Sequence, residues 1–129
     1  MGLLCCLLLS LSAHAGHYPV FRQDRIHGAG LLEDHSDALE RWLRLGIEDA
    51  VLINIDAHDD LRWIPADKIE ELRHLVRKGD RESIALANSA GDQGLYHPGS
   101  FIFAACRLGM VGKVYWVIPF AYFQGQNPS

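Results

Sequence analysis

The residues best suited to chemistry form one short acidic segment, Asp56-Ala57-His58-Asp59-Asp60, directly after the aliphatic run AVLINI. While a chain stays extended, residues two apart point the same way, so the side chains of Asp56, His58 and Asp60 can converge on one point. Carboxylates and imidazole together suit a first-row divalent cation such as Mn, Fe or Zn. The ordinary alternative is a solvated acidic turn, but the position after a strand and the embedded histidine favour a metal site.

Two further histidines are candidates for the same site. His35 precedes the acidic segment by one expected helix and one expected strand. Alone it is typical of a surface or capping residue, and its neighbours Asp34 and Ser36 are common helix caps. His97, in a loop and followed by proline, is a candidate proton shuttle, although a histidine in such a loop is more often simply exposed. By position alone, His35 is a candidate metal ligand and His97 a candidate catalytic residue.

The surrounding segments predict an α/β layered domain. AVLINI, residues 50–55, is the clearest strand, and such an aliphatic run is expected where both faces of a parallel sheet are covered. A strand, then helices, then a second strand in this order is typical of an α/β fold. The other expected elements are a helix after Ser36 ended by Gly46, a loop over 56–65, a helix over 66–78 ended by Gly79, helical turns over 81–88, a buried helix over 100–108, and a buried strand over 113–118.

The composition indicates one globular domain and argues against nucleic acid as a partner. The chain has 129 residues, of which 49% are hydrophobic and 22% charged. Its formal net charge is −4, and no basic cluster is present to bind phosphates. Cys106 lies in an apolar stretch and is expected to be an inert thiol. The aromatic residues expected in the core are Trp63, Tyr115, Trp116 and Phe120.

The first residues predict a signal peptide over 1–15, which would make the mature protein secreted or periplasmic. Leu3 to Leu11 is almost entirely apolar, and Ala13-His14-Ala15 has the small-x-small pattern of a cleavage site, so the mature chain would begin at Gly16. The run is shorter than the roughly 20 apolar residues of a membrane span, and no stable span is expected. Because no Lys or Arg precedes the run, a buried strand or helix at the domain edge and a misassigned start remain alternatives.

Taken together, the two segments resemble the ureohydrolase superfamily of arginases and agmatinases, which shares its fold with the histone deacetylases. Arginases carry Gly-Gly-Asp-His-Ser and then, after the next strand, Asp-Ala-His-x-Asp. This chain has Asp34-His35-Ser36 and then Asp56-Ala57-His58-Asp59-Asp60, with Leu32-Glu33 in place of the two glycines. That variant is more similar to a poorly characterised ureohydrolase-like family that includes peptide arginases. The resemblance covers roughly residues 18 to 120.

The resemblance implies a three-layer arginase-like α/β fold with a mainly parallel sheet, of which residues 16–129 would form the N-terminal part. It also implies a binuclear Mn²⁺ site, in which His35 and Asp60 hold one ion, His58 holds the other and Asp56 bridges them. A hydroxide between the ions would attack a guanidinium carbon, releasing urea and leaving an amine. The substrate would be a small guanidino compound or an arginine within a peptide.

The same pattern leads us to expect an incomplete site. Arginases place a further Asp-x-Asp pair on a later strand, whereas the last acidic residue here is Asp92 and no Asp-x-Asp follows Asp60. We therefore expect a C-terminally incomplete fragment that holds at most one ion weakly and does not turn over arginine. Two alternatives stay open: a non-catalytic or degenerate metal-binding domain, and a deacetylase-type amide hydrolase on the same fold. The sequence does not indicate an oligomeric state.

Overall fold

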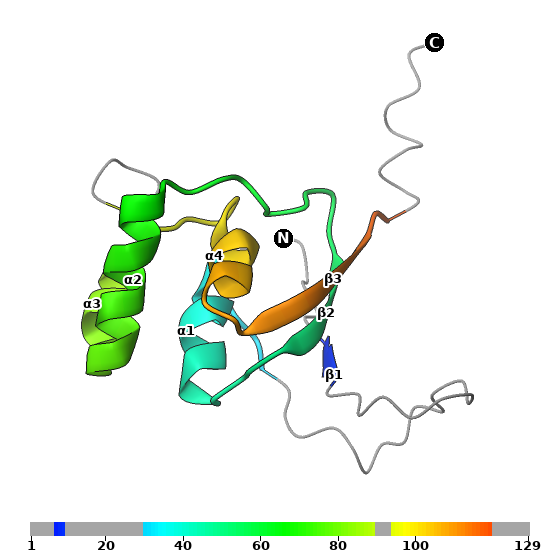
Figure 1. The fold of residues 1–129 in the computed structure, drawn as a ribbon. Coiled ribbons are helices and arrows are strands. Elements are labelled where there is room, and N and C mark those ends of the chain that lie inside the picture. Colours follow the sequence, from blue (N-terminus) through cyan, green and yellow to red (C-terminus); the bar gives the residue numbers. More distant parts are fainter. Residues whose placement is uncertain (1–6, 10–29, 90–93, 120–129) are drawn as a thin grey trace.

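The computed structural model describes residues 7–9, 30–89 and 94–119, which form a mixed α/β arrangement (Figure 1). Helices gather on one side of a small sheet, and a strand, several helices and a second strand follow one another as the sequence predicts. In chain order they are β1 (Leu7–Leu9), the short 3-10 turn η2 (His35–Asp37), α1 (Ala38–Arg44), β2 (Ala50–Ile55), α2 (Ala66–Lys78), α3 (Arg81–Leu86), α4 (Phe101–Arg107) and β3 (Val111–Val117).

The sheet has the order β1-β2-β3 and mixes both pairing directions. β2 and β3 are parallel, and their register pairs Ile55 with Val117, so the carboxyl ends of both strands lie at one edge. β1 pairs with β2 antiparallel. β1 falls inside the segment 1–15 that the sequence predicts as a leader, and the leader itself stays a prediction.

Helical and strand periodicity predicted these elements closely. The expected strand over 50–55 and helix over 66–78 have the observed bounds of β2 and α2. α2 ends at Gly79, whose φ of 68° is a left-handed conformation that glycine adopts without a steric penalty. α3 ends at Leu86, two residues before the expected 88, and β3 begins at Val111, ahead of the expected 113.

The core lies between the sheet and the helices. Leu39 and Trp42 of α1, Leu52 of β2, and Phe101 and Ile102 of α4 are all buried. The rings of Trp42 and Phe101 lie 5.8 Å apart, which brings α1 and α4 together next to the strands. Among the described residues, no helix is both long and apolar enough to cross a membrane.

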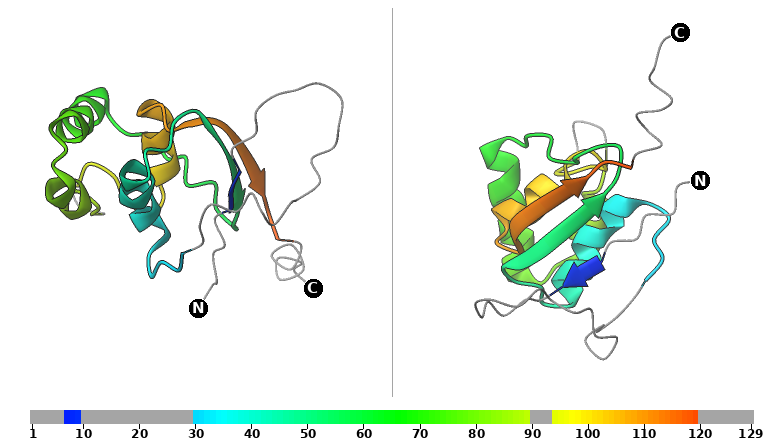
Figure 2. Two further views of the ribbon diagram at one scale, coloured as in Figure 1. Left: turned by 90° about the horizontal axis from the view of Figure 1, so that it is seen from below. Right: turned by 90° about the vertical axis from the view of Figure 1, so that its right-hand side faces the viewer.

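One face of the sheet carries no described helix, as the two views in Figure 2 show. The prediction that Trp63, Tyr115 and Trp116 belong to the core is wrong: these residues are 69%, 48% and 43% exposed. Tyr115 and Trp116 are consecutive residues of β3 and point to opposite faces, and Trp63 lies in the loop after β2. Phe120 lies outside the described residues. The expectation that both faces of AVLINI are covered also fails within the described part. The strand expected to be buried over 113–118 is instead mostly exposed, as β3. The α/β class is confirmed, whereas the three-layer arginase-like arrangement stays a prediction.

Candidate metal centre

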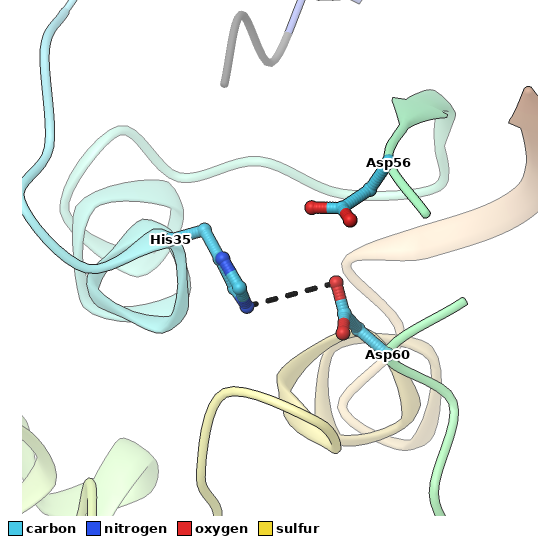
Figure 3. Close-up of side chains that lie close together, drawn as sticks. All are labelled: His35, Asp56 and Asp60. Carbon is cyan, nitrogen blue, oxygen red and sulfur yellow. Dashed lines mark ion pairs between the residues drawn. The ribbon is translucent and has the colours of Figure 1, made fainter. Parts of the chain in front are cut away.

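Three of the four predicted metal ligands come together at the carboxyl end of β2. One possible ligand atom each from His35, Asp56 and Asp60 lies within 4.8 Å of the other two. Figure 3 shows the three side chains pointing toward one another, with a dashed line from the imidazole to Asp60. That line joins His35 Nε2 and Asp60 Oδ2, which are 3.7 Å apart. One imidazole and two carboxylates form a suitable donor set for a divalent cation.

The loop after β2 brings its two aspartates together by turning sharply. The Asp56 carboxylate accepts a hydrogen bond from the His58 backbone N–H at 3.1 Å, which closes a local turn. Asp60 has a φ of 54°, in the left-handed region that aspartate visits more readily than most residues. Below the loop, the buried Asn54 donates from Nδ2 to the His58 carbonyl at 3.1 Å. The loop is thus fixed to the strand beneath it.

His35 approaches from the opposite side, on the short turn η2. Asp34 caps this turn by accepting a hydrogen bond from the Ser36 backbone N–H at 2.8 Å. Burial raises the pKa of Asp34, but the hydrogen bonds from the Ser36 hydroxyl and N–H outweigh that effect and lower the pKa below its ordinary value. The imidazole packs against the ring of Phe101 at 5.2 Å, and its Nε2 lies 3.2 Å from the Pro98 carbonyl oxygen.

Asp60 is the most deeply buried side chain of the group. Its side chain is 3% exposed, and its Oδ2 has no hydrogen-bond partner within the described part of the chain. Burial raises the pKa of Asp60; His35 lowers it and Asp56 raises it, and the result lies above the ordinary value. A buried acceptor without a partner is costly, so this oxygen is suited to a cation that would serve as its partner.

His58 is separate from the converging group. Its side chain is 77% exposed, and its Nδ1 lies 3.5 Å from Asp56 Oδ1. It lines an open cavity of about 300 Å³ together with His35, Asp59, Asp60, Pro98 and Gly99. The structure therefore brings His58 to the edge of the site, and its role as a ligand to a second ion stays a prediction.

His97 holds a turn beside this cavity. Its Nδ1 accepts a hydrogen bond from the Gly99 N–H at 3.1 Å, and its own backbone N–H donates to Ser100 Oγ at 3.0 Å. The turn is joined to the acidic loop, because the Arg62 N–H donates to the Gly99 carbonyl at 2.9 Å. Its neighbours Pro98 and Gly99 line the cavity, whereas the role of His97 as a proton shuttle stays a prediction.

Sequence reasoning did not single out three groups that surround the site. Asn54 is a lone polar residue within an aliphatic strand, a signal that was available in AVLINI. Its Oδ1 is also buried without a hydrogen-bond partner among the described residues. The Pro98 carbonyl and the side chain of Asn88 had no comparable signal, since only the folded chain brings them near His35 and Ser36.

Comparisons with family models, with curated proteins and with solved structures found no significant match to this chain. Function is therefore inferred from the residues of the site itself. The group His35, Asp56 and Asp60 could hold a metal ion, by its donor types, its spacing and the Asp60 oxygen that has no hydrogen-bond partner among the described residues.

Proposed function

We propose that this chain carries the metal site of an arginase-like hydrolase that cleaves a C–N bond of a guanidino compound, with Mn²⁺ as the metal. The observation that carries the proposal is the convergence of His35, Asp56 and Asp60 around a buried carboxylate oxygen that has no hydrogen-bond partner. The order of these residues along the chain, with a histidine before a strand and Asp-Ala-His-x-Asp after it, supports the ureohydrolase resemblance.

The proposal gives each candidate site residue a separate role. His35, Asp56 and Asp60 would hold one ion, and His58 is the candidate for a second. A divalent ion in this position supplies Lewis acidity, which makes hydroxide available near neutral pH. His97 would move a proton through Nε2, because its Nδ1 is engaged as the acceptor for the Gly99 N–H.

The cavity favours a cationic substrate. Asp59 is the lining carboxylate that the proposed ion does not use, and no lysine or arginine is among the lining residues. A guanidinium group is planar, positively charged and well matched to carboxylates. Because the cavity is open to solvent, free arginine and an arginine side chain within a peptide are both candidate substrates.

A second candidate function is metal binding without hydrolysis. It is favoured by the number of ligands, since three converging side chains in the described residues suffice for one ion and not for two. This candidate matches the sequence expectation of a single weakly held ion and no turnover of arginine.

Urea release separates the two candidates. The purified protein, loaded with Mn²⁺, is incubated with arginine and with an arginine-containing peptide, and urea is measured. Asp56→Asn serves as the inactive variant, and His74→Ala, an exposed histidine on α2, is the matched control. Urea from wild type and His74→Ala but not from Asp56→Asn supports the hydrolase. Bound Mn²⁺ without urea supports the second candidate, and absence of Mn²⁺ binding contradicts both.

A further inference from the structure

We propose that Asn88 is a positioning residue for His35: its side-chain amide holds the η2 turn in the orientation that points the imidazole at Asp60. The inference rests on the proposed function, because it assigns Asn88 a role in the metal site. Asn88 follows α3, and its side chain reaches back across the fold to η2.

The Asn88 amide bonds to the two residues that directly follow His35. Its Nδ2 donates to Ser36 Oγ at 2.7 Å and to Asp37 Oδ1 at 3.0 Å. Ser36 is fully buried, so its hydroxyl needs partners within the protein. Both amide protons are therefore used on a single turn of chain, which fixes how that turn is rotated.

The proton of the Ser36 hydroxyl completes a directed network. Ser36 Oγ lies 2.6 Å from Asp34 Oδ1 and 2.9 Å from Asn88 Oδ1, but a hydroxyl has only one proton to donate. The shorter contact is to a carboxylate, which is the stronger acceptor, so the proton belongs to Asp34. Ser36 then accepts from Asn88. The Ser36 hydroxyl thus joins Asp34 to the Asn88 amide, and the same amide also donates to Asp37.

The backbone next to Asn88 is also bonded to the segment that precedes Pro98. The Ala87 carbonyl accepts from the Leu95 N–H at 2.9 Å, and the Ser89 N–H donates to the Tyr96 carbonyl at 2.9 Å. This short bridge leads directly to Pro98, whose carbonyl oxygen lies 3.2 Å from His35 Nε2. One segment of chain therefore fixes both the turn that carries the imidazole and the carbonyl beside it.

Capping alone does not account for Asn88. Asp34 already caps η2 by accepting from the Ser36 N–H. What Asn88 adds is a connection between η2 and a distant part of the fold. Groups bonded directly to a ligand typically change metal affinity 10- to 100-fold when they are replaced. Because Asn88 acts on the residues next to His35 and not on the imidazole itself, the lower end of that range is expected.

The test compares Mn²⁺ affinity in Asn88→Ala and Asn88→Asp with that of wild type. Asn88→Asp keeps the shape of the side chain but removes the donor and places a like charge beside Asp37. The control is Ser83→Ala. Ser83 donates its hydroxyl proton to Asp80 at 2.8 Å at the start of α3, the same kind of contact that Ser36 makes to Asp34 in η2. We expect at least about tenfold weaker binding in both Asn88 variants and wild-type affinity in Ser83→Ala.

A second measurement needs no metal. In chelator-treated protein, the NMR shifts of the His35 ring protons report its placement against the Phe101 ring, and we expect them to change in the Asn88 variants and not in Ser83→Ala. If wild type binds no Mn²⁺, the proposed function fails while these shifts still test the positioning role. Wild-type affinity together with wild-type shifts overturns the inference. Loss of folding in both Asn88 variants also overturns it, because Asn88 would then be a structural residue.

Discussion

Asp60 combines three features that are unfavourable in a folded protein. Its carboxylate is buried, one oxygen has no hydrogen-bond partner, and its backbone adopts a left-handed conformation. Each of these features costs free energy in the metal-free protein. A bound cation would provide the partner that the described residues do not supply to this oxygen.

We therefore predict that Asp60→Asn stabilises the metal-free protein by about 1–3 kcal/mol at neutral pH, because a neutral amide replaces a buried charge. The pKa of Asp60 is raised by burial, so the native protein takes up a proton at a higher pH than the unfolded chain does. The free energy of unfolding of wild type is thus lower than that of Asp60→Asn by the full amount above the raised native pKa of Asp60. The difference shrinks as the pH falls through that pKa. Thermal unfolding in chelator across pH tests this, and a variant less stable than wild type at neutral pH contradicts it.

A second prediction ranks two predicted ligands. Asp56→Asn should lower Mn²⁺ affinity more than tenfold, because Asp56 belongs to the converging group. His58→Ala should have a smaller effect, because that side chain is largely exposed and lies outside the group. Metal content after dialysis measures both. Equal losses would show that His58 moves into the site when the ion binds.

The sequence identified the residue types of the site better than their geometry. Alternation along an extended chain predicted that Asp56, His58 and Asp60 share one side. The chain instead bends directly after β2, where the Asp56 carboxylate accepts the His58 N–H, and Asp60 joins the group through its left-handed backbone. Such bends depend on local side-chain hydrogen bonds and on Asn54 beneath the loop, neither of which a period-two pattern contains.

At the scale of elements, periodicity was informative where one face is buried. α2 was predicted with its observed bounds, since Ile69 and Leu72 recur at helical spacing and Gly79 ends the helix. β3 begins earlier than expected. Gly112 weakens the strand pattern in the sequence, whereas pairing with β2 in the fold extends the strand back to Val111. The exposure of Tyr115 followed from which sheet face the helices cover, which is a tertiary property.

The start of α3 gives a prediction with a defined pH dependence. Asp80 caps this helix by accepting from Ser83, and the hydrogen bonds from the Ser83 hydroxyl and N–H lower the pKa of Asp80 below its ordinary value of 3.8. The stability that these bonds contribute is present above the unfolded pKa and is lost as the pH falls through the native pKa. Asp80→Ala should melt below wild type at pH 7, with a gap that closes under acid conditions. A gap independent of pH would mean that the ionised carboxylate is not the cap.

At the scale of the whole molecule, export remains a prediction from the apolar segment at residues 3–11. If residues 1–15 are a signal peptide, N-terminal sequencing of the exported protein should give Gly16 as its first residue. Removal of the segment would leave the net charge unchanged, since it contains no charged side chain. Met1 retained in a cytoplasmic protein would contradict the prediction, and β1 would then be a permanent edge strand beside β2.

The α/β class could be predicted from the order of elements, whereas the covering of the sheet's second face could not. Mixed pairing arises because β1 runs antiparallel to β2, and no local pattern in Leu7–Leu9 sets that direction. The metal site depends on contacts between segments far apart in sequence, such as η2 and the turn at Pro98. Residue types therefore predicted a metal site, and the fold determined which of the candidate side chains converge there.

The most direct test of the metal site is a titration of chelator-treated protein with Mn²⁺, followed by calorimetry, for wild type and Asp60→Asn. Asp60→Asn keeps the shape of the side chain and removes the charge that the ion would neutralise. We predict saturable binding of one ion per chain in wild type. Binding in the variant should be at least about a hundredfold weaker, because the variant lacks a charged ligand; each tenfold corresponds to about 1.4 kcal/mol. No saturable binding by wild type, or equal binding by both proteins, would contradict the assignment of His35, Asp56 and Asp60 as a metal centre.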